Sequence, residues 1–382
     1  MFRKMPLILM AIIIAIILFN PLMSLEVKRL LYSISLSIKS IIGLFLPLII
    51  FGLLFKSVVM LAKDATRIVF LILLLVCGSN FCSTFISHYV GIYIYQFDLS
   101  MISPIENDSL KPLWLLNFPN IISNDKIVFS SIILGFISSK FCAEIAIGLA
   151  FKIEAFVAKI LRLFIYIIPL FIMGFIVKLQ FDEVLGIIIK DYMFIFGTIA
   201  FAQFGYIFLA YFILSNCRVK EFIASLSNMM PESISGFSAM SSVVSMPLSI
   251  IGAENNTNNK ALARTVVPIT VNIHLVGDCF AIPILAYAIL KSYGLAEPTL
   301  FNYLIFAFYF VLAKFSVAAI SGGGIIVMLP ILEQYLGFNT NMMSLITALY
   351  ILFDPVITCA NVLGNGAFVK LIDNIYSVTQ KA

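Results

Sequence analysis

The sequence predicts an all-α, polytopic membrane protein. Of its 382 residues, 62% are hydrophobic and only 11% are charged, whereas a soluble domain carries about 25% charged residues. Apolar segments long enough to cross a bilayer recur along the whole chain. The net charge of +5 is small and indicates no nucleic-acid partner. The six cysteines have neither the spacing of a metal site nor that of a disulfide framework.

Eight membrane spans are predicted in chain order. The N-terminal segment resembles a signal peptide, but no small-residue cleavage site follows it, and we therefore interpret it as a retained helix. The predicted spans are residues 6–25, 30–62, 68–95, 127–151, 163–179, 191–217, 263–287 and 345–372. A long polar loop is expected at 96–126, and a basic, amphipathic linker is expected at 152–162.

Two further apolar segments are too short and too interrupted to cross the membrane twice. Residues 221–253 are broken by SSVVSMP at 241–247, and residues 300–335 are broken by SGGG at 321–324. We predict that each segment forms a re-entrant helical hairpin. Interrupted hydrophobic segments in corresponding halves of a membrane protein are the best sequence pointer to a transporter's binding site.

The basic residues predict the orientation of the chain, with both termini in the cytoplasm. The inner side receives Arg3, Lys4, Lys63, Arg67, Lys152, Lys159, Arg162, Arg218, Lys220, Lys260, Arg264, Lys370 and Lys381. The outer side receives Lys28, Arg29, Lys111, Lys126, Lys178 and Lys291. In this orientation the first hairpin enters from the cytoplasm and the second from outside, which gives two gates.

The last span carries a polar stripe on an otherwise apolar helix. Its members are Asp354, Thr358, Asn361 and Asn365. At 100° per residue they fall within an arc of about 60°. An ionisable side chain at membrane depth usually faces a bundle interior or a cavity, and Pro355, Gly364 and Gly366 are expected to loosen the helix beside it. The alternative is a polar seam that binds the neighbouring helices.

Four stretches of this pattern carry a resemblance to a known family. They are SSVVSMP at 241–247, VPITVNIHLVGDCF at 267–280, SGGGIIVMLPIL at 321–332 and DPVITCANVLGN at 354–365. On these stretches the chain resembles the dicarboxylate/amino acid:cation symporter family, the bacterial and archaeal relatives of glutamate transporters. Pro47 and Pro169 also fall where the second and fifth helices of the family carry prolines.

The resemblance implies an architecture and a location. It implies eight transmembrane helices, two re-entrant hairpins and a homotrimer in the cell inner membrane, with elevator-type transport. Residues 1–65 would hold scaffold helices one and two, and residues 127–189 would hold scaffold helices four and five. Residues 66–126 would hold the third helix and the outer loop. Together with residues 190–382, that third helix would form the transport domain.

The resemblance also implies a substrate site. Asp354 falls on the aspartate that binds the substrate amino group, Asn361 falls on the asparagine that binds the carboxylate, and Thr358 lies beside them. Hydroxyl and backbone contacts to the substrate would come from the two hairpin tips, at Ser241, Ser242, Gly322 and Gly323. Ile357 replaces the arginine that pairs with a second substrate carboxylate. An unpaired buried carboxylate is costly, so a neutral amino acid or a related organic acid is favoured over an acidic one.

The cation-binding residues of the family are altered in this chain. The positions of the family's two cation-binding carboxylates are occupied here by Asn365 and Val276, and the position of the family's asparagine is occupied by His274. An acid that the family motif does not have appears at Asp278. On a continuous helix His274 and Asp278 would share a face, which predicts a proton relay. The alternatives are that the histidine caps a carbonyl and that the acid is a neutral donor. The predicted cation-coupling residues are His274, Gly277, Asp278, Asn361 and Asn365. A weakened sodium site at Gly277, Asn361 and Asn365 remains open, so the coupling ion is Na⁺ or H⁺.

Other assignments stay open at this stage. Lys314 either snorkels or pairs with a nearby acid, and Glu232 pairs with Lys220 or Arg218. The leading function is a cation-coupled symporter, with no cofactor and no enzymatic activity. The alternatives are a sodium-coupled carrier of dicarboxylates or acidic amino acids and a degenerate member that conducts anions passively. A further alternative is an aspartyl protease that uses Asp278 and Asp354, the two acids set in apolar helices.

Overall fold

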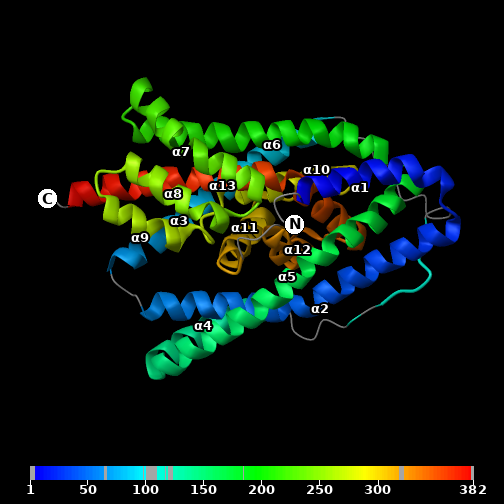
Figure 1. The fold of residues 1–382 in the computed structure, drawn as a ribbon, viewed down its shortest axis with the longest axis horizontal. Coiled ribbons are helices and arrows are strands. Elements are labelled where there is room, and N and C mark those ends of the chain that lie inside the picture. The colour runs from blue at the N-terminus through cyan, green and yellow to red at the C-terminus, as the bar shows by residue number, and fades with distance from the viewer. Residues whose placement is uncertain are drawn as a thin grey trace.

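The computed structural model describes residues 5–63, 67–97, 99, 110–116, 118, 124–183, 185–317 and 322–379, and these contain no strand. The protein is thus built from helices, as predicted (Figure 1). The elements are α1 (Met5–Phe19), the 3₁₀ turn η2 (Asn20–Leu22), α2 (Leu25–Lys63), α3 (Arg67–Tyr95), α4 (Asn124–Phe141), α5 (Ala143–Phe181), α6 (Leu185–Leu214), α7 (Val219–Ala239), α8 (Ser242–Asn256), α9 (Lys260–Thr270), α10 (Val276–Ser292), α11 (Leu300–Lys314), α12 (Gly323–Leu336) and α13 (Thr340–Thr379).

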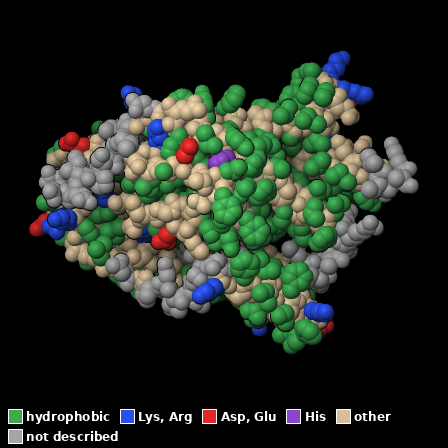
Figure 2. All heavy atoms as spheres, turned by 180° about the vertical axis from the view of Figure 1, so that it is seen from behind, with side chains coloured by type: hydrophobic (Ala, Val, Ile, Leu, Met, Phe, Trp, Pro, Cys, Tyr) green, Lys and Arg blue, Asp and Glu red, His purple; other side chains and the backbone are tan. Residues whose placement is uncertain are grey.

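Within the described part of the chain, four helical stretches are long and apolar enough to cross a bilayer. They are Leu25–Met60, Phe70–Tyr95, Lys190–Leu214 and Thr340–Ser377. Hydrophobic side chains also cover much of the outer face shown in Figure 2, as expected for a surface that meets lipid. The predicted total of eight transmembrane helices remains a prediction.

One group of helices is built on α2. This helix packs against α4 and α5 along the lower edge of the view in Figure 1. Ser35 of α2 donates to the Phe171 carbonyl of α5 at 2.6 Å, and Lys56 pairs with Glu154 at 3.0 Å. A Cβ atom on Gly174 would lie 2.1 Å from the Leu31 carbonyl oxygen, so the two helices approach more closely than any other residue at that position would allow.

A second group surrounds α10 and α13. The helix α10 packs against α3, α6 and α13, and all of its residues except Lys291 are buried. The helix α13 has 40 residues, which corresponds to a length of about 60 Å. It contacts both arms of the first hairpin, α7 and α8, and the second arm of the other hairpin, α12.

The two segments predicted as hairpins each form a pair of packed helices, and their re-entrant position in the membrane remains a prediction. The helix α7 packs against α8, and α11 packs against α12. The base of the first hairpin is tied to the C-terminal part of α13, where Asp373 accepts hydrogen bonds from the backbone N–H groups of Asn258 and Asn259 at 2.9 and 3.2 Å. The second hairpin ends at Leu336, just before α13 begins. The two hairpins therefore approach the middle of α13 from its opposite ends.

Two predicted boundaries and one predicted loosening of a helix were wrong. The helix break expected at 152–162 lies instead at Cys142, and α5 runs unbroken through the predicted linker because that linker contains neither Gly nor Pro. The span expected at 263–287 is two helices, separated by the non-helical residues 271–275. Conversely, α13 is continuous through Pro355, Gly364 and Gly366, because its packing on all sides outweighs their helix-breaking tendency.

The polar loop predicted at 96–126 lies mostly outside the described residues. Its described part, residues 110–116 and 118, includes a contact with α2, where the Leu113 N–H donates to the Ser33 hydroxyl at 2.7 Å.

Candidate functional site

The candidate site is organised by the break between α9 and α10. Asn80 of α3 holds this break from one side. Its side-chain amide donates to the Ile273 carbonyl at 2.7 Å, and its Oδ1 accepts from the Leu275 N–H at 3.2 Å. Both partners are backbone groups that would lack a helical partner at the break. No role for Asn80 was predicted, although it lies in the polar run CGSNFCS at 77–83, which is unusual in an apolar span.

The polar stripe of α13 holds the same break from the other side. Asn361 Oδ1 accepts from the N–H groups of Gly277 and Asp278 at 2.8 and 3.4 Å, and therefore caps the start of α10. Asn365 donates to the His274 carbonyl at 3.3 Å. A Cβ on Gly277 would lie 2.4 Å from the Ile357 carbonyl oxygen, so this close approach depends on glycine. The stripe thus binds the backbone of a neighbouring element, as the polar-seam alternative predicts.

The tip of the second hairpin rests on Asp354. The Gly322 N–H donates to Asp354 Oδ2 at 3.0 Å, and the Thr358 hydroxyl donates to Asp354 Oδ1 at 3.1 Å. Gly322 has φ 71° and caps α12, a left-handed conformation that favours glycine. The buried carboxylate is therefore held by two neutral hydrogen-bond donors.

The tip of the first hairpin reaches the same part of α13. The helix α7 ends at Ala239 and is followed by its C-cap Met240, Ser241 is the N-cap of α8, and Ser242 at the start of α8 is buried. One turn before the tip, a Cβ on Gly236 would lie 3.2 Å from Val362 and 3.6 Å from Thr358. Both hairpins, α10 and the polar stripe thus converge on residues 354–362. Ile357 lies in this region with no exposed surface.

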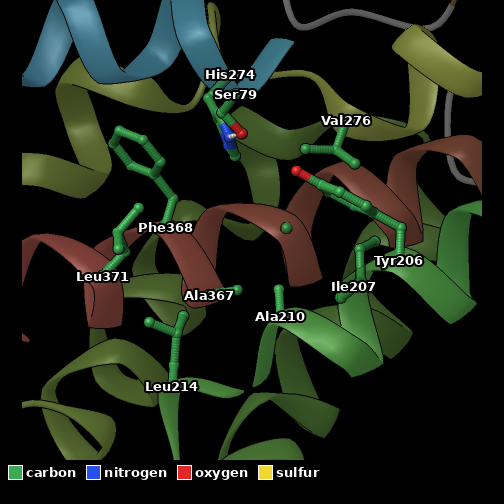
Figure 3. A pocket seen from close by; sticks show the side chains of 11 residues that line it. Ser79, Tyr206, Ile207, Ala210, Leu214, His274, Val276, Ala367, Phe368 and Leu371 are labelled. Carbon is green, nitrogen blue, oxygen red and sulfur yellow. Dashed lines mark hydrogen bonds between the residues drawn. The ribbon is translucent and has the colours of Figure 1, made fainter. Parts of the chain in front are cut away.

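His274 lies beside a small cavity between α3, α6 and α13 (Figure 3). The cavity has a volume of about 80 Å³ and is lined by Ser79, Tyr206, Val276 and Phe368, among others. The His274 Nε2 atom is hydrogen-bonded to the Ser79 hydroxyl at 2.8 Å. Within the described part of the chain, neither His274 Nδ1 nor Asn365 Oδ1 has a partner with full hydrogen-bond geometry, but the Asn365 side chain faces the His274 side chain. Buried polar atoms normally have partners, so a proton between these two facing side chains would complete a hydrogen bond.

The predicted pairing of His274 with Asp278 is not observed as a contact. The helix α10 begins at Val276, so His274 lies in the break and the i, i+4 argument does not apply. Asp278 instead binds Lys314 Nζ at 3.1 Å and the Tyr350 hydroxyl at 2.7 Å. Of the two alternatives for Lys314, pairing with an acid is the one observed. The sequence did not identify Asp278 as that acid, and it did not indicate Tyr350 as a second partner of Asp278.

Glu232 also differs from its prediction. Arg218 pairs with Glu221 at 2.8 Å, whereas Glu232 is buried on α7, 1% exposed. Neither carboxylate oxygen of Glu232 has a hydrogen-bond partner among the residues that the structure describes. The hydroxyl of Ser249 faces it from α8 but donates to the Ser245 carbonyl at 3.2 Å.

Comparison with known proteins identifies the family of the chain. The model of the sodium:dicarboxylate symporter family matches residues 5–375, which is almost the entire sequence. The chain therefore belongs to this family, and the resemblance drawn from the four sequence stretches is confirmed. No curated protein was found to be similar to the chain.

Membership of this family fixes the general class of the protein. It is a transporter of a symporter family, and its long apolar helices agree with a multi-pass membrane protein. The family is one of transporters and not of enzymes, which leaves the aspartyl protease alternative without support. The homotrimer, the inner-membrane location and the orientation of the termini remain predictions.

Proposed function

We propose that the protein is a secondary active symporter that imports a small neutral amino acid or a related organic acid together with a cation. The observation that carries this proposal is the convergence of two helical hairpins, from opposite ends of α13, on a buried carboxylate. Gly322 donates to Asp354 at 3.0 Å, and Gly236 of the other hairpin packs near Thr358. Hairpins placed in this way can open one side of the site at a time.

The substrate would bind along residues 354–361 of α13. Its ammonium group would compete with the Gly322 N–H for the Asp354 carboxylate, so binding would also change the position of the second hairpin tip. Its carboxylate would take N–H and hydroxyl donors at the hairpin tips, including Ser241 and Ser242. Ile357, fully buried, offers no charge to a second carboxylate, which favours a neutral side chain on the substrate.

The coupling ion would bind near the break before α10. The facing side chains of His274 and Asn365, beside the cavity of Figure 3, support a site there. An imidazole nitrogen suits a proton, whereas an amide oxygen and nearby carbonyls suit Na⁺. The proposed mechanism is elevator-type movement of residues 66–126 and 190–382 against the helices of residues 1–65 and 127–189.

Uptake by the purified protein in liposomes tests this function. The panel contains neutral amino acids, aspartate, glutamate and dicarboxylates, each under an inward Na⁺ gradient, an inward proton gradient, or neither. We expect a neutral substrate to accumulate only with a gradient, and Asp354→Asn to reduce that uptake by at least about tenfold, because a lost charge-assisted bond is worth about 1.5–3 kcal/mol. Glu221→Gln, an exposed carboxyl on α7, is the matched control and should transport normally.

The family description supports a second candidate, sodium-coupled transport of dicarboxylates or acidic amino acids. Na⁺-driven uptake of aspartate or a dicarboxylate, with no neutral substrate, would favour it and contradict the substrate assignment based on Ile357. Equal uptake with and without any gradient would instead indicate a passive carrier.

A further inference from the structure

The buried ion pair of Lys314 and Asp278 is a second charged centre, separate from Asp354. The exposed fractions of the two side chains are 0% and 2%, and their charged atoms lie 3.1 Å apart. Both groups come from elements that meet at the candidate site, since Lys314 ends the first arm of the second hairpin and Asp278 lies in the first turn of α10. The pair therefore joins the moving hairpin of the proposed mechanism to the broken helix.

The surroundings of Lys314 Nζ are those of a bound cation. On one side is the Asp278 carboxylate, and on another is the Phe310 ring, whose centroid is 4.4 Å away. The second carboxylate oxygen of Asp278 accepts from the Tyr350 hydroxyl at 2.7 Å. Asp278 itself lies at a helix N-terminus, where a negative charge is favoured.

The second arm of the hairpin closes over the same carboxylate. A Cβ on Gly324 would lie 2.8 Å from Asp278 Oδ2 and 2.4 Å from the Tyr350 hydroxyl. Both arms of the hairpin thus contact Asp278, one through a charge and the other through a glycine. A buried, ionised carboxylate without a partner is very costly, so closure of the hairpin requires either a proton or a positive charge at this point.

We propose that Lys314 is a tethered cation, whose ammonium group fills at Asp278 the place that a mobile coupling cation would otherwise occupy. Because this positive charge is part of the hairpin, it arrives when the hairpin closes and withdraws when it opens. The hairpin can then close without taking an ion from solution at this carboxylate. The inference rests on the proposed function for its role in transport, but the cation site itself can be tested without transport.

The test is the thermal unfolding of the purified full-length protein in choline, sodium, ammonium or methylammonium chloride at equal ionic strength. In choline, Lys314→Ala should lower Tm by about 5 °C or more, because it leaves a buried carboxylate without its partner. Ammonium, methylammonium or Na⁺ should restore at least half of this loss, a gain larger than any shown by the wild type. The double variant Lys314→Ala/Asp278→Asn should regain Tm in choline and lose the added response.

Lys314→Gln is the second variant, because it fills more of the space left by the lysine and should fold where Lys314→Ala does not. It also removes the positive charge and should show the same response to small cations. The proposal is overturned if neither variant responds to these cations more than the wild type, or if the response persists without the Asp278 carboxylate. That result in a protein that still accumulates substrate would leave the proposed function standing. A cation response in a protein that shows no uptake would support the tethered cation and contradict the proposed transport function.

Discussion

At the residue scale, the polar groups of this protein combine support of the backbone with the proposed binding of substrate and ion. Asn361 and Asn365 satisfy backbone groups at the break before α10, and Asp354 binds the tip of a hairpin. In the hydrocarbon core of a membrane there is no water to form hydrogen bonds with such backbone groups. The residues proposed to bind the substrate and the ion are thus the same residues that support the backbone around the site.

Glu232 is the buried acid that these interactions do not explain. Its carboxylate oxygens have no hydrogen-bond partner in the described part of the chain, and a buried charge without a partner is costly. We expect Glu232→Gln to leave Tm unchanged or to raise it, because glutamine has nearly the same shape and no charge. The measurement is thermal unfolding of the purified protein, with Glu221→Gln as an exposed control.

A loss of more than about 1 kcal/mol of stability in Glu232→Gln would contradict this expectation, since single hydrogen bonds contribute about that much. It would show that the folded protein uses the carboxylate as an acceptor or as a charge. The control should stay within about 0.5 kcal/mol, as is usual for surface substitutions.

At the element scale, the contact of α10 with α13 depends on Gly277. A Cβ there would lie 2.4 Å from the Ile357 carbonyl oxygen and 3.1 Å from Asn361 Oδ1. We expect Gly277→Ala to lower Tm and to reduce uptake, because the clash involves backbone of a packed helix and displaces the Asn361 cap. The matched control is Gly205→Ala on α6, where no atom lies within 4 Å of the added Cβ.

The control should be neutral or stabilising by up to about 1 kcal/mol, since alanine is the better helix former. If Gly277→Ala behaved like the control, the close approach of α10 and α13 would not be required for folding or for transport.

The sequence predicted some of these elements well because the relevant signals are local. The period of the stripe in α13 placed Asp354, Thr358, Asn361 and Asn365 on one face, and all four are buried. The break at 271–275 was missed because side chains from other helices, such as Asn80, maintain it. Lys314 and Asp278 are 36 residues apart, and only the packing of the hairpin against α10 identifies them as partners.

At the scale of the whole molecule, hydrogen bonds from α2 reach the second group of helices. Lys39 of α2 donates to the Thr340 carbonyl at 2.9 Å, and Ser57 of α2 donates to the Phe315 carbonyl at 3.1 Å. The second contact joins α2 to the second hairpin. If the second group moves as an elevator, this contact has to break during each transport cycle.

Cross-linking across this boundary tests the movement. In a background without the native cysteines, Ser57→Cys and Phe315→Cys are joined by Hg²⁺, and uptake is measured in liposomes. We expect the cross-link to abolish uptake and a thiol reductant to restore it. The matched control is Ser35→Cys with Phe171→Cys, where the serine also donates to a phenylalanine carbonyl, at 2.6 Å, but within the group built on α2. That pair should transport normally after cross-linking, because both helices would belong to the static scaffold. Full uptake with the first cross-link completely formed would show that α2 and the second hairpin do not separate, and the elevator would have to be abandoned for movement of the hairpins alone.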